Sequence, residues 1–133
     1  NPNDYEILNE SLFLYRQYGQ SKTEINRDYN PSYRKSETYY FIENLKRSLQ
    51  LQEPKLCSFL FHKTIALYID ALKHRDQTTA KLILQALQPL LTEHQKFFKQ
   101  LQLLRFLYIG LSLKSYRLEK YIRDTSLKLK LLS

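Results

Sequence analysis

The sequence contains no valine, no methionine and no tryptophan, and it has only two glycines and four prolines in 133 residues. Valine favours β-strands, and glycine and proline form the tight turns that join them, so a predominantly β-sheet protein is excluded. The glycines stand at positions 19 and 110, which excludes a glycine-rich phosphate-binding loop. No apolar run approaches the roughly 18 residues of a membrane-spanning helix, so we expect a soluble protein.

Leucine occurs 26 times, and tyrosine (11) and phenylalanine (7) supply most of the remaining apolar bulk. Leucine is a strong helix former, so the composition predicts an all-α protein. Charged residues make up 26% and apolar residues 43% of the chain, which excludes intrinsic disorder.

A single cysteine, Cys57, cannot form an intramolecular disulfide bond, and it lies among Leu56, Phe59 and Leu60. This setting predicts a buried, reduced thiol and a cytoplasmic location. Because the sequence begins at Asn1 without an initiator methionine, we expect a fragment or a processed product of a longer protein.

Apolar residues recur at spacings of three and four along most of the chain, which predicts amphipathic helices. The expected helices span residues 3–19, 36–53, 54–74, 77–88, 93–113 and 115–125. Asp76 and Thr92 are the expected N-caps of the fourth and fifth helices, Pro54 suits the first turn of the third, and Pro89 closes or kinks the fourth.

Residues 20–35 read as a polar connection: Ser21 to Glu24 fit a capping box, but Pro31 follows closely. We therefore expect an N-terminal helix and connection at 1–35 and a helical-hairpin domain at 36–133. The predicted architecture has five to seven helices, either as stacked antiparallel hairpins of tetratricopeptide-like type or as an irregular bundle.

Helical spacing also predicts which residues form the core. The expected buried stripes are Leu56, Leu60, Leu67 and Ala71 in the third helix, Phe97, Leu101, Leu104, Tyr108 and Leu111 in the fifth, and Leu118, Tyr121 and Ile122 in the sixth.

The net charge of +8 is concentrated near the C-terminus, since the residues from 95 onward include nine Lys and Arg but only two acidic residues. The candidate basic surface comprises Lys114, Arg117, Lys120 and Arg123. Such a surface is either a solvated helix face or a site for an acidic partner or nucleic acid.

No pattern in the sequence predicts catalysis, a metal site or a cofactor. Cys57 and His62 stand about 140° apart around one helix, too far for a nucleophile and its base. Asp70 and His74 share a helix face, but His94 is the only other free imidazole available to complete a metal site.

The stretch from Ile65 to Tyr116 resembles the C-terminal helical region of Rgg/GadR/MutR-type transcriptional regulators of Gram-positive bacteria. The resemblance rests on an Ala-x-x-x-Leu helix (Ala80 and Leu84) and on an aromatic-Leu-x-x-Gly-Leu pattern (Phe106, Leu107, Gly110 and Leu111). It implies a tetratricopeptide-like regulatory domain that dimerises and receives a signalling peptide, with DNA bound by a separate N-terminal helix-turn-helix.

The functional hypothesis is therefore a non-catalytic, peptide-sensing and dimerising domain of a bacterial transcription regulator. Its expected partner-binding residues are His62, Tyr68, Arg105 and Tyr108: the tyrosines for amphipathic contact area, Arg105 for a peptide carboxylate and His62 for hydrogen bonding. The alternative is direct binding of nucleic acid through the basic C-terminal third.

Overall fold

The computed structural model describes residues 29–132, and the predicted helix at 3–19 and the Ser21–Glu24 capping box lie outside them. The described chain contains five α-helices and no strand, which confirms the all-α prediction. The helices are α2 (Pro31–Gln50), α3 (Pro54–Lys73), α4 (Gln77–Leu87), α5 (Gln95–Arg105) and α6 (Tyr116–Lys128). A 3₁₀ turn, η1 (Gln88–Leu91), follows α4, and a π-helical turn, η2 (Phe106–Gly110), follows α5.

Helix starts follow the capping residues. The side chain of Asn30 accepts a hydrogen bond from the Tyr33 N–H at 3.2 Å, and Pro31 occupies the first helical position. The predicted start near Ser36 is therefore wrong, because residues 31–35 already belong to α2. The start of α3 at Pro54 is confirmed.

The N-cap prediction was confirmed for α4 and wrong for α5. Asp76 caps α4, accepting from the Thr79 N–H at 3.2 Å. Thr92 is not an N-cap, because a 3₁₀ turn that contains Pro89 precedes it and α5 begins only at Gln95. The N-cap residue of α5 is His94. The carbonyl of Thr92 accepts instead from the Gln95 side chain at 3.3 Å.

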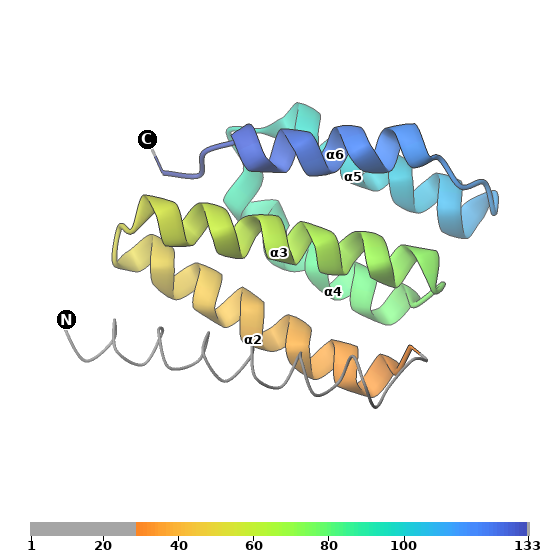
Figure 1. Cartoon of the computed structure of the whole chain (residues 1–133), viewed down its shortest axis with the longest axis horizontal. Coiled ribbons are helices and arrows are strands. Elements are labelled where there is room, and N and C mark those ends of the chain that lie inside the picture. The colour runs from red at the N-terminus through yellow and green to blue at the C-terminus, as the bar shows by residue number, and fades with distance from the viewer. Residues whose placement is uncertain (1–28, 133) are drawn as a thin grey trace.

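Successive helices run antiparallel, and α3 lies at the centre of the described structure, in contact with α2, α4 and α6 (Figure 1). The α5–α6 hairpin stacks on the α3–α4 hairpin, with α6 beside α3 and α5 behind it. No helix in the described range is both long enough and apolar enough to cross a bilayer.

The core is centred on α3, whose Leu60, Phe61, Ile65 and Tyr68 are completely buried. Two predicted core residues are exposed instead. Leu111 is 49% exposed, because the helix ends at Gly110 and the 3.6-residue period no longer places its side chain. Tyr121 is 48% exposed, because α6 packs through the face that carries Glu119, Ile122 and Ser126.

Candidate functional site

Tyr68, one of the predicted partner-binding residues, is inaccessible. Its side chain is completely buried, and its hydroxyl donates a 2.6 Å hydrogen bond to the Leu101 carbonyl, which joins α3 to α5. Burial raises the pKa of this phenol, while the charge of Arg105 opposes the rise. The prediction that Tyr68 contacts a partner is therefore wrong, since the residue is part of the core.

Tyr108 is also buried, with 3% of its surface exposed. Its hydroxyl donates to the Glu119 carboxylate and accepts from the Ser115 N–H at 3.1 Å, so it ties η2 to the start of α6. Desolvation and the hydrogen bond to Glu119 raise the pKa of Tyr108 to about 12. Direct contact with a partner was thus wrongly predicted for this residue as well.

Glu119 is a buried charge that the sequence analysis missed. Its side chain is 5% exposed, and its Oε1 lies 3.9 Å from Lys73 Nζ and 3.6 Å from Arg123 Nη2. One signal was available, because Glu119 stands three and seven residues before Ile122 and Ser126, on the buried face of α6. Tyr108 hydrogen-bonds one oxygen of this carboxylate, and the charges of Lys73 and Arg123 lie near the other oxygen, Oε1, which accepts no hydrogen bond.

The four residues of the predicted basic surface differ in their position relative to the Glu119 carboxylate. Arg123 turns partly inward toward Glu119 and is half-buried. Lys114, Arg117 and Lys120 are exposed, so these three cations face solvent.

His62 joins α3 to α6. Its Nδ1 lies 2.8 Å from Ser126 Oγ, and that hydroxyl donates to the Arg123 carbonyl at 2.7 Å. Since the serine proton is used by the carbonyl, the Nδ1–H of His62 is the donor of the first bond. Burial lowers the pKa of His62, and the nearby charges of Lys63 and Arg123 lower it further. Its placement supports packing between these two helices.

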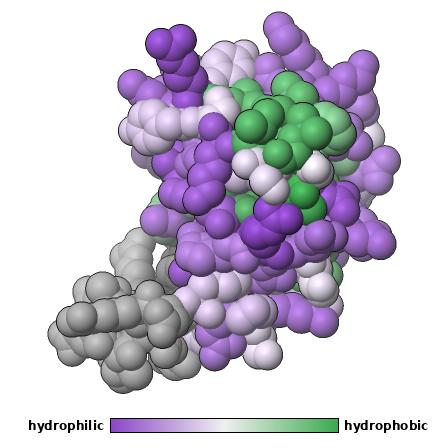
Figure 2. Space-filling view, turned by 90° about the vertical axis from the view of Figure 1, so that its right-hand side faces the viewer, coloured by the Kyte–Doolittle hydropathy of each residue, from purple (hydrophilic) through white to green (hydrophobic). Residues whose placement is uncertain are grey.

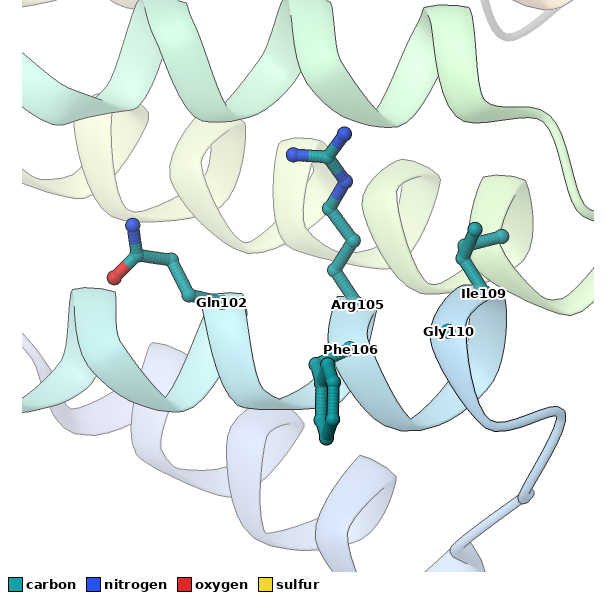
Figure 3. Close-up of a pocket in the computed structure, with 5 residues that line it drawn as sticks. All are labelled: Gln102, Arg105, Phe106, Ile109 and Gly110. Atoms are coloured by element: carbon teal, nitrogen blue, oxygen red, sulfur yellow. The ribbon is translucent and has the colours of Figure 1, made fainter.

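Arg105, another of the predicted partner-binding residues, lines an open hollow. The hollow has a volume of about 290 Å³ and is lined by Gln102, Arg105, Phe106, Ile109 and Gly110. Gln102, Arg105 and Ile109 project to one side of α5 and η2, and Phe106 projects to the other (Figure 3). Within residues 29–132, the Arg105 guanidinium forms no ion pair.

An exposed apolar patch adjoins this hollow. We define the apolar patch as Leu103, Phe106, Leu111 and Leu113, which are 47%, 56%, 49% and 56% exposed. Figure 2 shows apolar surface surrounded by hydrophilic side chains at the end of the molecule where the α5–α6 connection lies in Figure 1. The π-helical turn η2, a feature often found at functional sites, contributes Phe106 to the patch.

The connection that carries Leu111 and Leu113 is held in place from the neighbouring hairpin. Ser112 has a left-handed backbone, with φ of 54°, and its hydroxyl accepts a 3.0 Å hydrogen bond from Arg75. The same guanidinium donates to the Tyr108 carbonyl at 3.4 Å. Arg75 is itself left-handed, with φ of 58°. Two residues in this uncommon conformation therefore position the patch.

Comparison with known proteins does not assign the chain to a family. No family model matches the chain, no curated protein matches its sequence, and no solved structure matches its fold.

The remaining polar constellations are separate from the apolar patch. Tyr29 stacks on His74 at 4.3 Å between ring centroids and donates to Asp76 at 2.8 Å. Arg34 bridges Glu37 and Asp70 at 2.7 and 3.1 Å. Among residues 29–132, no group of three or more His, Cys, Asp or Glu side chains is arranged to hold a metal ion.

Proposed function

We propose that this chain is a non-catalytic helical interaction domain that binds a peptide or protein segment through the apolar patch. The observation that carries the proposal is the cluster of four large apolar side chains, each about half exposed, on one helix end and the adjoining connection. Contiguous exposed apolar surface costs solubility and commonly marks an interaction site. The positioning of this surface by Arg75 and Ser112 supports a preformed site.

The proposal extends to a peptide-sensing and dimerising part of a cytoplasmic bacterial transcription regulator, with DNA bound by another module. The stacked helical hairpins and the Rgg-type sequence pattern support this role. Sedimentation over a hundredfold range of protein concentration tests dimerisation. A strict monomer would remove the dimerising role and leave peptide binding to be judged separately.

Selection from a displayed random-peptide library tests the binding role. We expect selected peptides to bind the wild-type chain and to lose roughly tenfold or more in affinity with Phe106→Asp, because a charge would be buried in the interface. Tyr39→Asp is the matched control, since Tyr39 is a 48% exposed aromatic residue on α2. Recovery of no binding peptide, or equal losses in the two variants, would count against the proposal.

A second candidate function is direct binding of nucleic acid, and one observation favours it. Tyr116 and Tyr121 are 74% and 48% exposed on α6, and the exposed cations Arg117 and Lys120 lie between them in the sequence. Aromatic rings and cations on one face can stack on bases and contact phosphates. Binding of labelled single-stranded and duplex DNA across a salt series tests this function, and an absence of binding at low salt would remove it.

A further inference from the structure

The apolar patch lies in a surface whose exposed charges are almost all positive. The exposed cations of α5, α6 and their connection are Lys96, Lys99, Lys114, Arg117, Lys120 and Lys128. Of the two acidic residues in this region, Glu119 is buried and neutralised by Lys73 and Arg123. Asp124 alone is exposed there. A partner that approaches the patch therefore meets a positive potential.

We propose, resting on the proposed function, that the occupant of the apolar patch is an amphipathic helix with an acidic polar face. Leu103 and Phe106 lie one turn apart on the helical part of the patch, and Leu113 extends it past Gly110. Such a row fits apolar anchors spaced three, four and seven residues apart on a partner helix. The exposed cations Lys114 and Arg117, which follow the patch in the sequence, then face the acidic side chains that flank those anchors.

Arg105 supplies a specific contact for one acidic side chain. It lines the same hollow as Phe106, although the two side chains project to opposite sides of α5 (Figure 3), and its guanidinium is not paired with any carboxylate of the described chain. A guanidinium offers parallel donors that match a carboxylate. The hollow, about 290 Å³, has room for a side chain of the partner between Arg105 and Ile109.

A second copy of the chain fits this surface less well. A two-fold symmetric contact would place the patch on its own counterpart and bring the two sets of exposed cations together. The net charge of +8 on each chain adds to that repulsion. An anionic membrane matches the charge, but it would leave the hollow beside Arg105 without a specific occupant.

Three designed helical peptides with the same leucine stripe test the inference, with Glu, Gln or Lys on the polar face. We expect fluorescence anisotropy to show that the wild-type chain binds the Glu peptide at least roughly tenfold more tightly than the Lys peptide, with affinity falling as salt rises. Arg105→Gln should weaken the Glu peptide roughly fivefold and leave the Gln peptide nearly unchanged. Lys55→Gln, an exposed cation at the start of α3, is the control and should change neither.

The other possible results of these binding experiments would each overturn a specific claim. Equal or tighter binding of the Gln or Lys peptide would overturn the proposal of an acidic helix. An Arg105→Gln variant that binds the Glu peptide like the wild type would overturn it as well. In either case, library peptides that lose affinity with Phe106→Asp would still support the interaction domain. Binding to phosphatidylglycerol vesicles without binding to the Glu peptide would assign the surface to a membrane. Failure of every peptide, library and designed, would overturn both proposals.

Discussion

The hydroxyl of Tyr108 donates a hydrogen bond to the carboxylate of Glu119, across eleven residues of sequence and in the interior of the protein. The same carboxylate faces Arg123 on its own helix and Lys73 on α3. One acidic group thus links η2, α6 and α3, the elements that hold the α5–α6 hairpin against the rest of the described fold.

Removal of the Glu119 carboxylate should destabilise the protein more than removal of an exposed one. We expect Glu119→Ala to lower the free energy of unfolding by about 3 kcal/mol, because Tyr108, Lys73 and Arg123 lose their shared partner. Glu119→Gln should cost about half as much, since its amide oxygen can still accept from Tyr108. Urea denaturation followed by circular dichroism measures both, and Asp124→Asn, on the exposed side of α6, should stay within about 0.5 kcal/mol of the wild type. A loss in the control equal to that of Glu119→Ala would contradict this account.

Tyr108 should contribute to a loss of stability in alkali, as should Tyr68, whose pKa is also raised by burial. The pKa of Tyr108 is about 12 in the folded chain, against about 10 in the unfolded chain. Between these values the unfolded chain releases the proton first, so the free energy of unfolding falls as pH rises, by up to about 2 kcal/mol. Urea denaturation at pH 9 and pH 11 should show a smaller decline for Tyr108→Phe than for the wild type. Parallel declines would show that Tyr108 does not cause the loss.

The cap of α4 should depend on the side-chain oxygens of Asp76. Burial opposes ionisation of this carboxyl, but hydrogen bonds from the Thr79 side chain, the Tyr29 hydroxyl and the Thr79 N–H hold its pKa below the usual value. We expect Asp76→Ala to lower the free energy of unfolding by about 1–2 kcal/mol. Asp76→Asn should recover most of that loss in thermal or urea denaturation, since Asn also caps helices. Equal losses in both variants would point to the charge rather than the cap.

Acidification should weaken the contact between α3 and α6 through His62. Its folded pKa lies below the unfolded value of about 6.5, so its contribution to stability is complete above that value and is lost as pH falls through the folded pKa. His62→Gln should cost about 1 kcal/mol at pH 8 and lose less stability than the wild type between pH 7.5 and pH 5. His94→Gln, which removes another half-buried histidine, is the matched control variant. If His62→Gln lost as much stability on acidification as the wild type, this histidine would be excluded as the cause.

The start of a helix was predicted correctly where one capping side chain or one proline ring determines the backbone conformation. Asp76 and Pro54 act within one turn of chain, and both predictions were confirmed. The start of α2 differs from the prediction because Pro31 does not only disfavour helix at the residue before it. Pro31 also opens the helix that follows, with Asn30 as the N-cap. The exposure of Leu111 was missed because the π-helical turn interrupts the regular helix period.

The candidate site was less predictable, because it depends on contacts between distant segments. Tyr68 and Tyr108 have the amphipathic character of binding residues, but their hydroxyls are used by Leu101 and Glu119 inside the protein. Helical spacing predicted the burial of Tyr108, but the local pattern does not show which group its hydroxyl contacts inside the protein. Arg105 was predicted as a carboxylate ligand, and its place beside an open hollow leaves that expectation to be tested.

The π-helical turn also allows the end of α5 to absorb a change in the length of the chain. In η2 the Leu111 N–H bonds to the Phe106 carbonyl five residues back, so this turn holds one residue more than an α-helical turn. Loss of a single codon here, such as that of Ile109, would restore ordinary helix geometry and leave the following residue one turn after Phe106, as it is now. The connection that carries Leu111 and Leu113 could thus keep its place through an in-frame deletion that would rotate the following side chains by about 100° in a regular α-helix.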